Sequence, residues 1–189
     1  EKSGTNVTGT SDNFPIGNQF ELLKKLIPNA KRVGILYNTS ESNSEVQVEE
    51  AKKAASSFGL EIVTAGLTNV NEVPQALNSL IGKVDVLYIP TDNVVASSMP
   101  IIANECFKKN IPIIGSERAH VTQGALATSG VDFNKLGYET GLQAVQIIEG
   151  KKPSEIPITA PKNMELLAAS SFTKSSMFFG AVIGISLGF

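Results

Sequence analysis

Three apolar segments of this chain each end in a short polar loop that leads into a helical pattern. The segments are residues 33–37, 84–89 and 111–114, and the loops after them are residues 38–44, 91–93 and 115–117. Near-continuous apolar strands are typical of a parallel sheet that is covered on both faces. In such a sheet the loops at the carboxyl ends of the strands form the ligand crevice. The pattern therefore predicts both a fold class and the position of a small-molecule site.

Strand-like and helix-like segments alternate along the chain, which predicts an α/β fold with a Rossmann-like parallel sheet flanked by helices. The expected strands are residues 32–37, 60–63, 84–89, 111–114, a shorter edge-like strand at 124–128, and closing strands at 156–159 and 164–167, with a short strand or hinge at 6–10. The expected helices are residues 18–27, 45–58, 71–81, 94–110 and 134–149. Pro100 should kink or restart the fourth of these helices.

Composition and motifs exclude several classes of function. Lys and Arg number 16 against 18 Asp and Glu, so the chain shows no charge signature of nucleic-acid binding. Cys106 and His120 are the only residues of their types, which excludes an internal disulfide and a typical zinc site. Phosphate-binding glycine motifs are absent from the sequence. We therefore expect a binding protein without catalysis, cofactor or metal, in which Cys106 is buried as a small hydrophobic residue.

The loop after the first apolar segment carries Ser42, Asn43 and Ser44. The start of a helix has free backbone N–H groups and a favourable dipole, so it attracts a carboxylate or another anion. Ser and Asn are also the residue types that most often cap helices. Ligand contact and plain capping both remain open for this loop.

Acidic residues follow two other segments of the predicted sheet. Asp92 and Asn93 stand at the equivalent place after residues 84–89, where an acidic side chain facing the crevice is suited to an ammonium group. A carboxylate there is equally suited to capping the next helix. Glu117 follows residues 111–114 and, taken alone, is better explained as a rim residue.

An ordered set of motifs carries a family resemblance. They are residues 4–9 (GTNVTG), 21–38 (ELLKKLIPNAKRVGILYN), 90–93 (PTDN), 124–128 (GALAT) and 136–138 (LGY). Together they resemble the bacterial ABC-transporter substrate-binding proteins that include the tryptophan-binding lipoproteins of Gram-positive bacteria. The resemblance runs from about Gly4 to Leu167. It implies the fold of type I periplasmic binding proteins, in which two Rossmann-like lobes joined by three crossing segments trap a ligand.

The resemblance also implies a function and a set of contacts. Its members sit on the outer face of the cytoplasmic membrane, usually through a lipid anchor, and deliver a small ligand, often an aromatic amino acid, to an ABC permease. We therefore expect an extracytoplasmic, membrane-associated protein, although this chain carries no signal peptide. The residues that the resemblance implies for ligand binding are Ser42, Asn43, Ser44, Asp92, Asn93, Glu117 and Thr8. A ligand-sensing core of a transcription regulator on the same fold is the alternative.

Mapped onto the chain, the resemblance predicts five parts. They are a hinge remnant at 1–12, a second, ligand-binding lobe at 13–118, a remnant of the first lobe at 119–155, a closing crossing strand at 156–172 and an apolar tail at 173–189. Residues 177–189 are uncharged and shorter than the roughly 20 residues of a membrane span. They suit either a buried terminal element or the first part of a membrane helix. Because such proteins close two lobes over their ligand, we expect the isolated chain to bind weakly or not at all.

Overall fold

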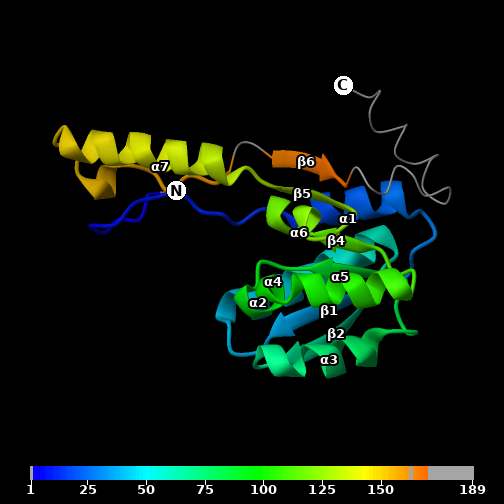
Figure 1. Cartoon of the computed structure of the whole chain (residues 1–189). Coiled ribbons are helices and arrows are strands. Elements are labelled where there is room, and N and C mark those ends of the chain that lie inside the picture. The colour runs from blue at the N-terminus through cyan, green and yellow to red at the C-terminus, as the bar shows by residue number, and fades with distance from the viewer. Residues whose placement is uncertain (1, 162–163, 170–189) are drawn as a thin grey trace. The chain divides into compact units, whose positions relative to one another are not determined.

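A six-stranded sheet forms the centre of the fold, in the order β2-β1-β3-β4-β5-β6 (Figure 1). The structure is a computed structural model that describes residues 2–161 and 164–169. The strands are β1 (Arg32–Asn38), β2 (Glu61–Leu67), β3 (Val86–Ile89), β4 (Ile113–Gly115), β5 (Ala127–Val131) and β6 (Met164–Ala168). β1 pairs in parallel with both β2 and β3, and the β3–β4 and β4–β5 pairs are parallel as well. The predicted α/β class with a parallel sheet is confirmed.

Helices alternate with these strands along the chain. They are α1 (Ile16–Leu26), α2 (Ser42–Ala55), α3 (Val73–Leu80), α4 (Asn93–Ser97), α5 (Met99–Lys108), α6 (Arg118–Thr122) and α7 (Phe133–Ile148), with short 3₁₀ turns at Ser56–Phe58, Val70–Glu72 and Pro153–Glu155. Pro100 lies in the first turn of α5, and a proline there needs no N–H partner. The expected helix over 94–110 is therefore restarted, as predicted.

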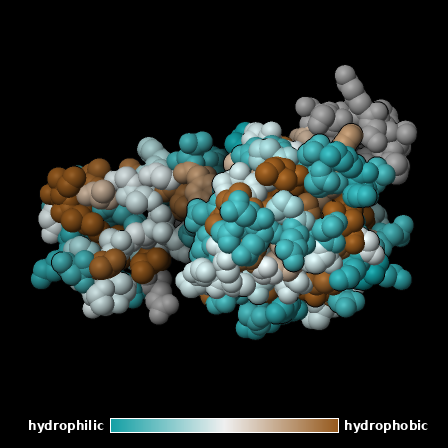
Figure 2. All heavy atoms as spheres, turned by 60° about the horizontal axis from the view of Figure 1, so that its bottom comes forward, coloured by the Kyte–Doolittle hydropathy of each residue, from teal (hydrophilic) through white to brown (hydrophobic). Residues whose placement is uncertain are grey.

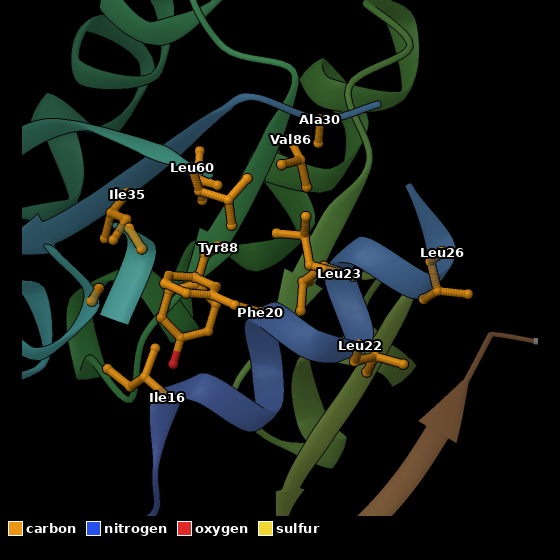
Figure 3. Close-up of a cluster of buried hydrophobic side chains, with 14 of the residues drawn as sticks. Ile16, Phe20, Leu22, Leu23, Leu26, Ala30, Ile35, Leu60, Val86 and Tyr88 are labelled. Carbon is orange, nitrogen blue, oxygen red and sulfur yellow. The ribbon is translucent and has the colours of Figure 1, made fainter. Parts of the chain in front are cut away.

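One face of the sheet packs against α1 and α2. Ile35, Val86 and Tyr88 point to this face and join Phe20 of α1 in a single buried cluster (Figure 3). The Phe20 and Tyr88 rings meet edge to face, with their centroids 5.9 Å apart. Because side chains alternate along a strand, Leu36 of β1 points to the opposite face.

The opposite face packs against α3, α4 and α5. Leu36, Leu87 and Ile113 belong to a second buried cluster together with Cys106 of α5. Cys106 is buried, as predicted, and burial raises the pKa of its thiol to about 12. The strands are apolar on both faces because both faces are covered, which is the pattern read from the sequence.

The chain divides into two compact units. The sheet unit comprises Ile16–Ser129 and the described residues 166–169, and it contains both hydrophobic clusters. The α7 unit comprises Glu1–Pro15 and Gly130–Glu165. The assignment of residues 1–12, 13–118, 119–155 and 156–172 to parts of two lobes stays a prediction. The predicted tail at 173–189 lies outside the described residues.

Two strand predictions are wrong. β5, expected at the edge, lies between β4 and β6, because a strand from residues 164–168 pairs beyond it. Residues 156–159 form no strand but two single bridges, Pro157 with Lys2 and Thr159 with Thr10. Proline has no N–H for a sheet ladder, which limits pairing around Pro157. Within the described ranges, no helix combines the length and apolar character needed to cross a membrane.

Candidate functional site

Three polar loops meet at one edge of the sheet, where β1, β3 and β4 end. The strands are parallel neighbours, so their carboxyl ends lie on the same side. The Ser116 N–H donates to the Ile89 carbonyl at 3.0 Å and ties the end of β4 to that of β3. The three loops therefore lie together at one edge, as predicted from a parallel sheet, and their role in ligand binding stays a prediction.

Asp92 is the centre of the hydrogen bonds at this edge. Its side chain caps α4, because Oδ1 accepts the Val95 N–H at 2.9 Å. Oδ2 accepts the Asn38 N–H at 2.6 Å and the Ser44 hydroxyl at 2.7 Å. Asp92 is only 2% exposed and Ser44 is fully buried. The Asp92–Ser44 hydrogen bond links the loops after β1 and β3 and stabilises them. Three hydrogen-bond donors already compensate the charge of the Asp92 carboxylate.

The first turn of α2 reaches across to the loop after β3. α2 begins at Ser42, three residues earlier than predicted, and its N-cap Glu41 makes no side-chain capping bond. Capping of α2 by the Ser and Asn side chains of this loop is therefore wrong. Instead, Asn43 Nδ2 donates to the Thr91 carbonyl at 2.9 Å, while Ser42 is exposed. Asn43 and Asp92 thus lie on the same edge, as expected.

Glu41 is a site residue that sequence reasoning missed. Its Oε1 accepts a hydrogen bond from Asn38 Nδ2 at 3.1 Å. Its Oε2 accepts from the backbone N–H and the Nδ2 of Asn93, at 3.3 and 2.9 Å. Asn93 is exposed, and among the described residues its Oδ1 has no donor. The only hint in the sequence was an acidic residue three positions after an Asn that ends a strand.

Glu117 and His120 lie after β4, in and beside the short helix α6. Glu117 is half-buried and its side chain makes no capping bond, whereas His120 is fully buried. His120 Nδ1 accepts the Ser116 N–H at 3.2 Å, which assigns the ring proton to Nε2. Nε2 lies 3.4 Å from Glu117 Oε1. Burial lowers the pKa of His120 to about 4 and raises the pKa of Glu117, so His120 is neutral near pH 7.

The same residues do not form a nucleophilic centre. The Ser116 hydroxyl lies 3.5 Å from His120 Nδ1, but that nitrogen already accepts the Ser116 N–H, and Ser116 is buried. In the described part of the chain no group of three His, Cys, Asp or Glu residues could hold a metal ion. The edge is suited to holding polar groups of a small molecule.

Thr8 belongs to the α7 unit, whereas the other six residues expected to bind ligand belong to the sheet unit. Its hydroxyl donates to the Ile156 carbonyl at 2.9 Å. This bond joins the N-terminal segment to the segment after α7 within that unit. The structure therefore brings together six of the seven expected residues, all in the sheet unit.

Comparison with known proteins gives a consistent picture. The family model described as ABC transporter substrate binding protein matches residues 1–177. A tyrosine-binding protein of Clostridioides difficile is 47% identical over 167 residues, which is 88% of this chain and 48% of that protein.

Two solved structures resemble most of this chain. An ABC domain from Streptococcus pneumonia in complex with L-Trp has a TM-score of 0.83 and 36% identity, over 92% of this chain and 60% of that one. A ligand-free, open substrate-binding protein with adhesive properties from Clostridium difficile has a TM-score of 0.76 and 46% identity, over 92% of this chain and 59% of that one. The fold is that of type I periplasmic binding proteins.

The chain spans about half the length of the curated relatives it matches. The family consists of extracytoplasmic solute-binding proteins that work with ABC transporters. Because the family model covers nearly the whole sequence and the edge has the polar loops that the motifs predicted, this chain belongs to the ABC transporter substrate-binding protein family.

Proposed function

We propose that this chain forms a ligand-binding part of the solute-binding component of an ABC importer, with a small aromatic amino acid as its ligand. The ligand class is supported by the relative described as tyrosine-binding and by the related domain in complex with L-Trp. The proposal includes delivery of the ligand to a permease at the outer face of the cytoplasmic membrane. Membrane association would come through that permease or a lipid anchor.

The observation that carries the proposal is the pre-organised polar edge at the ends of β1, β3 and β4. Buried groups such as Asp92 and Ser44 fix the loops, and exposed groups such as Ser42, Asn43 and Asn93 remain at the surface. A site that is rigid before binding loses less entropy when the ligand arrives. The free N–H groups and dipole at the start of α2 favour the ligand carboxylate.

The proposed function is ligand binding without catalysis. The alternative, a ligand-sensing core of a transcription regulator, requires an attached DNA-binding domain. Neighbouring genes separate the two, because adjacent permease and ATPase genes accompany an importer. A regulator gene would instead adjoin the operon that it controls.

Ligand binding is tested on the complete gene product that carries this chain, by thermal shift with amino acids, sugars and nucleosides. Ligand at 100 times Kd adds about 2.7 kcal/mol, so L-tyrosine or L-tryptophan should raise Tm by roughly 5–10 °C. We expect the isolated chain to respond weakly or not at all. Stabilisation by sugars or nucleosides, with none by any amino acid, would contradict the proposed ligand class.

A pair of variants tests whether the edge is the site. Asn93→Ala removes an exposed amide at the edge, and Asn104→Ala removes an exposed amide on α5. Loss of one hydrogen bond costs about 1 kcal/mol, so Asn93→Ala should weaken binding about threefold to tenfold. Asn104→Ala should leave the titration unchanged. If the two variants bind the ligand with equal affinity, the binding site does not lie at this edge.

A further inference from the structure

Three carboxylates lie at the crevice edge, and one of them differs from the others. Asp92 accepts three hydrogen bonds and Glu41 accepts bonds from two asparagines. Among the described residues, Glu117 has a single polar side-chain contact, His120 Nε2 at 3.4 Å. A half-buried carboxylate is costly unless hydrogen bonds or an opposite charge compensate it. Glu117 therefore retains acceptor capacity that Asp92 and Glu41 have used.

His120 presents an unused donor to this carboxylate. Its Nε2 is buried and has no hydrogen-bond partner, because at 3.4 Å the contact with Glu117 is too long and poorly aligned to count as one. The ring cannot easily turn away. Its Nδ1 is held by the Ser116 N–H, and α6 packs so closely on β4 that a Cβ at Gly115 would lie 2.5 Å from the His120 Cβ. The Glu117 carboxylate and the His120 ring therefore form a loose pair, in which the Nε2 proton is available to a carboxylate that comes closer.

A cationic group on the open side of Glu117 would complete the arrangement. A metal ion does not fit, because the site supplies one carboxylate and an imidazole whose Nδ1 already accepts a bond and whose Nε2 carries the proton. An alkylammonium fits better, since it brings three N–H donors and a compensating charge. Burial raises the pKa of Glu117, the direction expected for a carboxyl group that lacks such a partner.

Resting on the proposed function, we propose that Glu117 binds the ammonium group of the amino-acid ligand and that His120 is the positioning residue that holds its carboxylate. The loop after the neighbouring strand β3 carries the exposed Asn93. Adjacent strands lie about 4.8 Å apart, so one amino-acid head group can reach both loops. Asp92, the acidic residue that the sequence favoured for this role, is instead committed to the loops themselves.

The test compares ligands with and without the ammonium group, by calorimetric titration of the complete gene product. The probes are L-tyrosine and L-tryptophan, with 3-(4-hydroxyphenyl)propionate and 3-(indol-3-yl)propionate as their des-amino analogues. Glu117→Gln should weaken binding of the amino acids about tenfold to a hundredfold, as expected for a charged hydrogen bond. It should leave the des-amino analogues within about twofold.

Two further variants keep the result interpretable. Glu61→Gln removes the same charge from an exposed position at the amino end of β2, at the opposite edge of the sheet, and it should leave all four affinities within about twofold. Glu117→Asp keeps the charge but retracts it by one methylene, so an intermediate loss is expected even if the glutamine variant folds poorly. Circular dichroism and thermal melting check the fold of each protein.

The contrary outcomes are distinct. Glu117→Gln could weaken the binding of the amino acids and of the des-amino analogues to the same degree, or weaken neither. Either result would overturn the role of Glu117 and leave the proposed function standing. Absence of any amino-acid binding by the wild type would overturn the proposed function as well.

The role of His120 has a spectroscopic test, ¹⁵N NMR of its ring. The spectrum should show a neutral ring protonated on Nε2, and adding L-tyrosine should shift the Nε2 resonance in the wild type but not in Glu117→Gln. A resonance that L-tyrosine leaves in place in the wild type would remove His120 from the proposal.

Discussion

Helices α1 and α7 have similar apolar content but opposite surroundings. α1 turns its apolar side chains inward, with Phe20 and Leu23 at 0% exposure. α7 leaves Tyr138 70% and Ile148 85% exposed. Figure 2 shows apolar side chains gathered on the surface of the part of the molecule that carries α7 in Figure 1.

The apolar residues of α7 form a stripe, and the buried residue of the helix is polar. Tyr138, Leu142, Val145 and Ile148 follow one another at spacings of three and four, which place them on one face. Gln143 is buried and its Nε2 donates to the Pro157 carbonyl and the Thr159 hydroxyl. Contiguous exposed apolar residues usually mark a surface that another molecule or segment covers. The comparison teaches that an apolar pattern predicts a helix without revealing what packs against it.

The largest expected effect lies in the covered helix. Leu23→Ala removes a fully buried side chain from the cluster that α1 shares with β1 and β3. Such a substitution leaves a cavity and lowers the free energy of unfolding by about 3 kcal/mol, within a range of 2–5. Urea denaturation followed by circular dichroism measures it. A loss below about 1 kcal/mol would mean that α1 is not packed as the structure shows.

A second prediction concerns buried polar groups, which also differ between the units. The sheet unit buries His120, which titrates, whereas α7 buries Gln143, which does not. The folded-state pKa of His120 is about 4, below its ordinary 6.5, so the unfolded chain binds the proton more tightly between these values. His120 therefore lowers stability as pH falls from 6.5 towards 4. Glu117 acts in the opposite direction, because its pKa is raised in the folded state.

The pH effect is isolated by comparing the wild type with His120→Gln. From pH 7 to pH 4.5, the shift of His120 contributes a loss of about 2 kcal/mol. The variant should lose less free energy of unfolding than the wild type by about that amount, in urea titrations at the two pH values. Carboxylates whose pKa is lowered in the folded state, such as Asp85 and Asp132, weaken both proteins alike at low pH. Identical pH dependence in the two proteins would show that folding does not lower the pKa of His120.

Much of the sheet and the edge could be predicted from the sequence because the information is local. The apolar segments behind β1, β3 and β4 are nearly continuous, and parallel strands must end on a common edge. The capping role of Asp92 is equally local, because its Oδ1 accepts the N–H of Val95, which is only three residues further along the chain.

The rest depends on contacts between distant residues. The partners Asn38 and Ser44 reach Asp92 across 54 and 48 residues, so its full set of bonds could not be read from the sequence. α6 has only five residues, too few to show a helical period. The interior position of β5 depends on β6, which arrives from residues 164–168.

The smallest expected effect lies in the exposed helix and gives the most direct test of the comparison. Leu142→Ala is the same chemical change as Leu23→Ala, but Leu142 is 47% exposed on the stripe of α7. Surface substitutions usually change stability by less than about 0.5 kcal/mol, and alanine also favours helices. The free energy of unfolding of the chain should therefore stay within that margin in the same urea titration. A loss approaching that of Leu23→Ala would show that the stripe is covered in solution, and α7 would then be stabilised by burial of its apolar face, as α1 is.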